Sequence, residues 1–149
     1  MSGPFNGYWE NAVHNQRVII PALFKRRFSE ESQRTVVITA GFDNSIALYP
    51  LDNWYSTLAE LAEGSEEEQD FRSMLIRCAV AEAELEGPGR VRLPERELRK
   101  AGITDRCVVK GDHHLISLWD PQRFYQDLDN YEAEIRSRFD AKLWHKGRR

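Results

Sequence analysis

The sequence contains little of the residue chemistry that metal centres and redox sites need. It has two cysteines, Cys78 and Cys107, which stand far apart and form no Cys-x-x-Cys motif. Of its four histidines, His113 and His114 are adjacent and the other two stand alone, so none has the spacing of metal ligands. We therefore expect two buried thiols, no zinc site and no cofactor.

The chain also lacks the motifs of common enzyme classes. It contains no glycine-rich phosphate loop, no nucleophile elbow and no pairing of cysteine with histidine. Alternating acids at Glu82, Glu84 and Glu86 could hold a divalent cation or do acid/base chemistry, but such alternation is also typical of a solvated strand edge, which we favour. A carboxylate-dependent enzyme is a distant third interpretation, and we expect no catalytic activity.

Long apolar runs are absent as well. No stretch approaches the roughly 20 apolar residues that a membrane helix needs, and residues 1–6 lack the basic and apolar regions of a signal peptide. The 149 residues suffice for one compact domain, or for one domain built of two halves. These features predict a cytoplasmic protein without membrane contact.

Acidic and basic residues are segregated along a chain whose net charge is −3. Residues 41–87 contain eleven acids and two bases, whereas residues 88–110 contain seven bases and three acids. A basic segment of this kind permits a local anion-binding face on an acidic protein, although a solvated polar surface explains any one of these charges alone.

The feature that organises the sequence is an internal repeat. Residues 17–21 read Arg-Val-Ile-Ile-Pro and residues 90–94 read Arg-Val-Arg-Leu-Pro, so the copies start 73 residues apart. Each copy is followed by a short segment that ends in adjacent cations. Further on, Tyr49 is matched by Trp119 only 70 residues later, so the second copy is three residues shorter. The chain therefore consists of two copies of one sequence unit.

Hydrophobic periodicity and turn residues predict a similar order of elements in each copy, namely strand, strand, short helix, β-hairpin and helix. The expected elements are strands at 5–13 and 18–20, a helix at 22–28, a hairpin of 35–40 and 45–49, a helix over 54–61, a second helix capped by Ser65, a strand at 79–86, a hairpin of 107–110 and 115–119, and a helix capped by Asp120.

Two of the predicted helices carry apolar stripes. The helix capped by Ser65 has a stripe of Phe71, Met74, Leu75 and Cys78, which we expect to pack in the core. The C-terminal helix has apolar residues at intervals of three and four as far as Leu143, which is longer than a small core requires. We therefore expect the C-terminal helix to contact a partner, most simply another copy of the chain.

The two copies together resemble the MraZ family, whose members are bacterial proteins with two units of the SpoVT/AbrB type. The resemblance rests on the duplicated arginine-to-proline motif, on hairpins that end in Leu-Tyr-Pro at 48–50 and Ser-Leu-Trp-Asp at 117–120, and on the helices that follow them. It implies a first repeat with its helix at 5–62, a connecting helix at 63–78, a second repeat with its helix at 79–131, and a C-terminal helix extension with a basic tail at 132–149.

The resemblance implies an α+β fold, a pseudo-symmetric swapped-hairpin β-barrel of the double-psi, AbrB-like kind, formed by two tandem repeats with peripheral helices. It also implies a ring-shaped homo-oligomer, an octamer or similar, that binds double-stranded DNA. Such proteins are expected to repress the bacterial division and cell-wall gene cluster, including their own promoter, by sequence-specific binding to short direct repeats. The chain is then expected in the cytoplasm, associated with the nucleoid.

Matching the motif position by position identifies candidate DNA contacts. Arg17 and Arg90 are the motif arginines, and an arginine there can contact a guanine edge bidentately. The cations beside them suit phosphate contacts. The complete candidate set is Arg17, Lys25, Arg26, Arg27, Arg90, Arg92, Arg99 and Lys100.

The first copy departs from the family's motif. Residues 13–17 read Val-His-Asn-Gln-Arg and lack the acid and the glycine, whereas residues 86–90 read Glu-Gly-Pro-Gly-Arg and keep both. Gln16 therefore stands where a residue with positive φ is wanted. Because the first copy has lost the obvious acidic partner of Arg17, we expect Arg17 to be the freer arginine and the first DNA contact.

Two alternatives stay open at this point. Each motif arginine could hydrogen-bond within the barrel instead of meeting an external anion. The chain could also be a ring-forming structural or interaction protein that has lost specific DNA binding, an interpretation suggested by its net acidity and by the altered first motif.

Overall fold

The computed structural model describes residues 1–147 and confirms the α+β class. The first half contains β1 (Tyr8–Ala12), β2 (Arg17–Ile19), α1 (Ala22–Lys25), the 3-10 turn η1 (Glu30–Ser32), β3 (Thr35–Ala40), the 3-10 turn η2 (Phe42–Asn44), β4 (Ile46–Pro50), α2 (Leu51–Ala62) and α3 (Glu66–Cys78). The second half contains β5 (Ala81–Glu84), β6 (Arg90–Arg92), α4 (Glu95–Ala101), β7 (Arg106–Asp112), β8 (Leu115–Trp119), α5 (Pro121–Arg138) and α6 (Ala141–Trp144).

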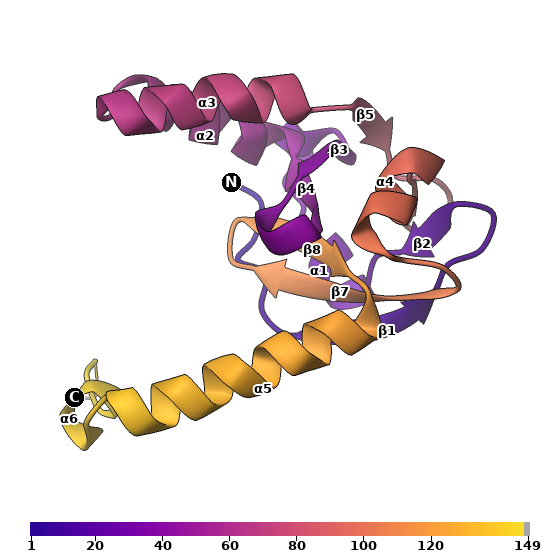
Figure 1. Ribbon diagram of the computed structural model, residues 1–149. Helices are drawn as coiled ribbons and strands as arrows, with labels where there is room; N and C mark the ends of the chain where they lie inside the picture. Colours follow the sequence, from indigo (N-terminus) through magenta and orange to yellow (C-terminus); the bar gives the residue numbers. More distant parts are fainter. Residues whose placement is uncertain (148–149) are drawn as a thin grey trace.

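The strands form a six-stranded antiparallel sheet of order β1-β7-β8-β4-β3-β5 and a separate two-stranded ribbon of β2 and β6 (Figure 1). Both predicted hairpins are confirmed, β3 with β4 and β7 with β8, and they meet where β4 pairs with β8. The first strand of each half is exchanged, because β1 pairs with β7 and β5 pairs with β3.

The expected β-barrel is not closed within residues 1–147. The large sheet has free edges at β1 and β5, and no strand pairing joins them. The physical reason is that the ribbon covers one face of the sheet by side-chain packing and adds no ladder of hydrogen bonds to its edges. Val18 and Val91 of the ribbon lie in the same buried cluster as Ile38 of β3 and Val109 of β7.

The other face of the sheet is covered by helices at two separate places. Val37 and Tyr49 of the sheet pack against Trp54 of α2 and Leu75 of α3. A third cluster joins β7 and β8 to Phe124 of α5. Alternate residues of each central strand therefore face the two layers, which is why these strands read as continuous apolar runs.

The predicted core role of the α3 stripe is wrong for most of its members. The helix itself has the expected capping box between Ser65 and Glu68. Leu75 is buried, but Phe71 is 51% exposed and Met74 is 64% exposed. The reason is that α3 touches the sheet near its C-terminal end and otherwise lies against α2 (Figure 1).

The two cysteines differ in environment. Cys107 is buried, as predicted, and burial raises the pKa of its thiol to about 12, which makes the thiol unreactive near neutral pH. Cys78 was expected to be buried as well, but it is exposed at the end of α3.

The C-terminal helix is capped by Asp120 as expected, yet it ends earlier than the apolar spacing predicts. Arg138 is the last residue of α5, and Phe139 has extended backbone (φ −110°, ψ 138°). The side chain of Asp140 then caps the short helix α6, in which Leu143 lies. The predicted basic tail thus begins in α6, and its last two residues, 148 and 149, lie outside the described residues. Within residues 1–147 no helix is long and apolar enough to cross a bilayer.

The N-terminus is tied to the start of α2 by Asp52. The Ser2 amide donates to Asp52 Oδ2 and the Ser2 hydroxyl to Asp52 Oδ1, each at 2.8 Å. The Ser29 hydroxyl donates to Oδ2, also at 2.8 Å. Burial on its own raises the pKa of Asp52, but the hydrogen bonds from Ser29 and Ser2 outweigh it and hold the pKa below its ordinary value of 3.8.

The lowered pKa predicts an acid-sensitive contribution to stability. Asp52→Ala removes the acceptor of three hydrogen bonds and is expected to lower the free energy of unfolding by about 2 kcal/mol at pH 7. Because the folded-state pKa is depressed, the contribution is complete above the ordinary carboxyl pKa and is lost as pH falls below it. Urea unfolding from pH 7 to pH 3 measures the difference, and exposed Asp129→Ala is the control. An unchanged difference at pH 3 would contradict the prediction.

Candidate nucleic-acid interface

The ribbon of β2 and β6 carries cations on its outer face. The register pairs Arg17 with Arg92, Val18 with Val91 and Ile19 with Arg90. Both valines are fully buried. Because side chains alternate along a strand and directly opposite residues share a face, the outer face holds Arg17, Ile19, Arg90 and Arg92. Three of these four residues are arginines, so the ribbon exposes a short basic surface.

The turn that precedes β2 is a tight two-residue connection. The amide of His14 donates to the Arg17 carbonyl at 3.0 Å, and the Arg17 amide donates back at 2.9 Å. Asn15 and Gln16 between them have φ of +50° and +63°, as in a type I′ turn. The prediction of positive φ at Gln16 is confirmed. The backbone strain at Gln16 is offset by two hydrogen bonds to the second half of the chain. The Gln16 side-chain amide donates to the Leu93 carbonyl, and the Leu93 amide donates to the Gln16 carbonyl.

The turn that precedes β6 is one residue longer. It spans Glu86 to Arg90, closed by backbone hydrogen bonds of 2.7 and 2.8 Å between these two residues. Gly89 has φ of +113°, which is accessible almost only to glycine, and a Cβ there would lie 2.7 Å from Lys25 Cδ. Lys25 in turn donates from Nζ to the Pro88 carbonyl at 2.6 Å. A cation of α1 is thus fixed on this turn.

Arg17 is not the freer arginine. Its Nε lies 2.6 Å from Oε1 of Glu86, and its Nη1 donates to the Asn15 carbonyl at 3.1 Å. The hydrogen bond from Arg17, helped by the charges of Arg17, Arg90 and Arg92, lowers the pKa of Glu86. The sequence prediction failed because it sought an acid in the same copy, whereas the acid comes from the other copy, across the ribbon.

Arg90 and Arg92 are the two exposed arginines of the ribbon, and neither forms an ion pair within residues 1–147. The guanidinium of Arg90 lies over Gly87. A further cation, Arg34 at the start of β3, donates from Nη2 to the Gly87 carbonyl at 3.3 Å. Arg34 was not among the predicted site residues because it belongs to neither motif, and only the exchange of strands brings it beside the second turn.

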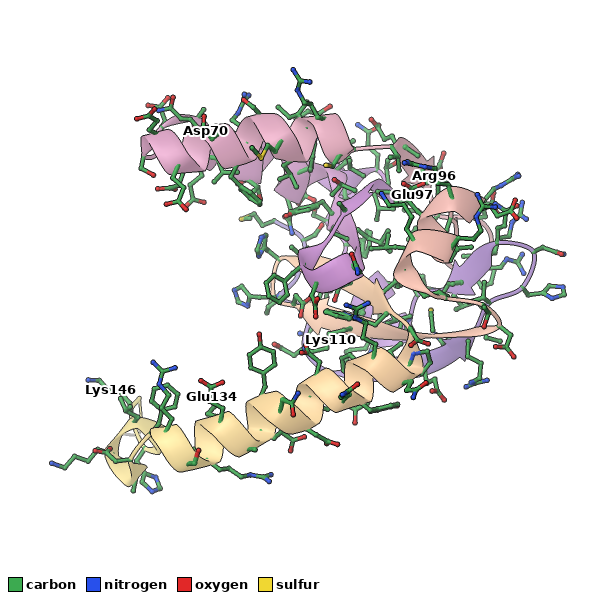
Figure 2. All side chains as sticks on the ribbon, in the orientation of Figure 1. Asp70, Arg96, Glu97, Lys110, Glu134 and Lys146 are labelled. Atoms are coloured by element: carbon green, nitrogen blue, oxygen red, sulfur yellow. The ribbon has the colours of Figure 1, made fainter. Side chains whose placement is uncertain are left out.

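The remaining predicted cations lie farther from the ribbon's outer face. Arg26 is exposed, and Arg27 donates to the Pro4 carbonyl at 2.8 Å. Arg99 pairs with Glu95 along α4 at 3.5 Å. Lys100 lines a different hollow with Arg96, between α4 and the end of α3; Figure 2 labels Arg96 on α4. The structure therefore gathers Arg17, Lys25, Arg90 and Arg92 at the two turns and places Arg99 and Lys100 apart.

The acids of β5 border the ribbon. Glu82 and Glu84 are exposed on this edge strand and line a hollow together with Glu86 and Arg92. Within the described part of the chain, no three acidic, histidine or cysteine side chains are grouped so that they could hold a metal ion.

Comparison with known proteins identifies the family. The profile of the family described as "MraZ protein, putative antitoxin-like" matches residues 14–77 and again residues 79–145. The chain belongs to the MraZ family. Proteins named transcriptional regulator MraZ from Shewanella baltica strain OS195 and Shewanella putrefaciens strain CN-32 are each 31% identical to it over 124 residues, which cover 81% of this chain and 82% of the relative. The MraZ protein of Shewanella sp. strain MR-4 is 30% identical over the same length.

The two glycines of the second turn give a matched test of its geometry. Gly89→Ala forces a side chain into φ of +113° and against Lys25, so we expect the free energy of unfolding to fall by about 2–3 kcal/mol. Gly87→Ala keeps φ near +51°, in the left-handed region, and is expected to cost about 1 kcal/mol. Chemical denaturation of both variants measures the contrast, and equal losses would contradict the turn described here.

Proposed function

We propose that this MraZ-family chain is a transcriptional repressor that binds double-stranded DNA through the outer face of the ribbon. The observation that carries the proposal is the row of Arg17, Arg90 and Arg92 on a two-stranded antiparallel ribbon. The major groove of B-DNA admits such a ribbon, and arginine reads guanine there through its O6 and N7 acceptors. Lys25 and Arg34, fixed at the second turn, are placed to contact phosphates beside the groove.

The names of the relatives support the regulatory part of the proposal, because the Shewanella proteins are called transcriptional regulators. For this chain we propose repression of the bacterial division and cell-wall gene cluster, including its own promoter, through short direct repeats. A protein with this role acts on the chromosome, so we place it in the cytoplasm at the nucleoid. No cofactor and no catalytic step enter the proposal.

The proposal includes assembly into a ring, an octamer or similar, through an apolar groove. This groove, of about 710 Å³, is lined by residues of α3, of α5 and of the sheet face between them. Figure 1 shows these two helices on either side of the sheet's helix-covered face. Its lining includes Tyr49, Phe71, Met74, Trp119, Leu128 and Tyr131. Met74 and Tyr131 are 64% and 53% exposed, and the apolar row of α5 continues to Ile135 and Phe139 beyond the sheet. In an isolated chain, this apolar surface is exposed to water.

The charges at the two ends of the helical face favour a second copy of the chain as the occupant of the groove. Acids cluster at the start of α3, whereas Lys142 lies in α6 and Lys146 follows it; Figure 2 shows Asp70 on α3 and Lys146 at the far end of the C-terminal segment. Because α5 leads away from the sheet, its own C-terminal end lies apart from α3 (Figure 1). The end of α5 and α6 of one copy can therefore meet the helix pair α2 and α3 of the next.

The swapped-hairpin character of the fold also belongs to the proposal. The exchange of β1 and β5 between the halves supports it, as does the single core shared by the sheet and the ribbon. The alternative function, a ring-forming interaction protein without specific DNA binding, is favoured by one observation. This observation is the ion pair of Glu86 with Arg17, one of the two motif arginines.

DNA binding is tested with a fluorescently labelled fragment from upstream of the gene and an unrelated fragment of equal length. Wild type is expected to prefer the upstream fragment, with an affinity that falls steeply with salt. Arg17→Ala/Arg90→Ala should weaken upstream binding at least about 30-fold, because each arginine is worth about 1–3 kcal/mol of discrimination.

The matched control is Arg77→Ala/Arg123→Ala, which removes two exposed cations from α3 and α5. It should change the affinity by less than about threefold, because exposed charges away from the interface contribute little. Equal and weak binding of the two fragments by wild type would refute the repressor and support the alternative function.

Ring assembly is tested by sedimentation velocity. Wild type should sediment as a species several times the 17.4 kDa of one chain. Met74→Asp/Tyr131→Asp places charges on both walls of the groove and is expected to give monomers, because each buried carboxylate would lack a partner. Ser73→Asp, on the same helix but outside the groove lining, should leave the assembly intact. A monomeric wild type would refute the ring.

A further inference from the structure

The two motif arginines occupy equivalent places but have unequal partners. His14 and Glu86 each open the turn that leads to a motif arginine, because the amide of each donates to the carbonyl of that arginine. Arg17 reaches across the ribbon to Glu86, the residue that opens the other turn. If the Arg90 side chain extended across the ribbon in the same way, it would meet His14, which has no carboxylate. The two strands are therefore alike in their backbone pairing, apart from the longer second turn, but they differ in the charge that faces each motif arginine.

Glu86 lies at the centre of the basic surface. It lines one hollow together with Arg17 and Arg90, and a second hollow together with Arg92. The charges of all three arginines favour its ionised form. Any anion that approaches the outer face of the ribbon therefore meets a carboxylate already bound to one arginine.

We propose that Glu86 is an intramolecular competitor of DNA for Arg17, so that the ribbon docks on DNA through Arg90, and Arg17 joins only when DNA displaces Glu86. This inference rests on the proposed DNA-binding function. It reverses the order of use of the two arginines that the motif alone predicts, and it assigns Glu86 a role in setting affinity.

The pair is suited to reversible competition. The side chains of Arg17 and Glu86 are 32% and 45% exposed, and an ion pair this exposed is weak because water and salt screen it. A phosphate or a guanine edge can replace a single carboxylate oxygen with bidentate contacts to the same guanidinium. Glu86 thus lowers affinity without abolishing it, and its removal makes one more arginine available.

The competition predicts a gain of binding on removal of the acid. Glu86→Gln should tighten upstream-fragment binding about fivefold and steepen the dependence of log K on log salt by about 0.9, the value of one further phosphate contact. Glu84→Gln, which removes an exposed acid from the neighbouring strand, is the matched control and should change affinity less than about twofold. Arg90→Ala should weaken binding at least about fivefold more than Arg17→Ala.

The double variants separate competition from a general loss of negative charge. Glu86→Gln/Arg17→Ala should bind like Arg17→Ala, because the gain requires Arg17, whereas Glu86→Gln/Arg90→Ala should keep the gain over Arg90→Ala. A gain that persists without Arg17, weaker binding by Glu86→Gln, or equal losses for the two arginines would overturn the inference. Thermal unfolding of each variant confirms that the exposed substitutions leave the fold intact.

Failure of the inference and failure of the proposed function give different results. If wild type prefers the upstream fragment and Glu86→Gln binds it no more tightly, the inference alone is overturned. If neither wild type nor Glu86→Gln distinguishes the two fragments at low salt, the proposed function is overturned, and the inference with it.

Discussion

The pairing of β2 with β6 is the contact on which the rest of the structure depends. Each strand has three residues, and the two are 73 residues apart in the chain. Strands this short have little stability of their own, so the ribbon persists because Val18 and Val91 are anchored in the core shared with the sheet. The register follows from that burial, because a slip of one residue would turn the valines outward and the arginines inward. Neither half of the chain can build the basic surface alone.

The sequence predicted those features that depend on local chemistry. The hairpins, the capping box at Ser65, the cap at Asp120 and the positive φ at Gln16 all follow from residues close together in the chain. The family followed from the repeat, because two motifs in register with similar elements are specific. These predictions needed no knowledge of which half packs against which.

The features that failed depend on contacts between the halves or on the shape of the whole chain. Glu86 holds Arg17 only because β2 and β6 are paired, and Arg34 reaches the second turn only because β5 lies beside β3. The α3 stripe has the spacing of a core helix, but spacing cannot say whether a partner element is present to cover Phe71 and Met74. A β-barrel was expected from the family resemblance, whereas no strand pairing joins the ribbon to the sheet and the two share only a buried core.

The positions of the ribbon and the groove relate the proposed DNA binding to the proposed assembly. Figure 1 shows β2 at one end of the molecule and the outer ends of α3 and α5 at the other, so the proposed assembly through the groove would leave the ribbons uncovered. A ribbon of three residues per strand reaches few base pairs, and one of its three arginines is held by Glu86. Under the proposed function, a single copy therefore binds DNA only weakly. In the proposed ring, each further contact with DNA becomes an intramolecular one, with a high effective concentration of ribbon at the next repeat. The weakness of each ribbon then becomes a source of specificity, since only a series of correctly spaced sites engages enough copies to hold the assembly on DNA.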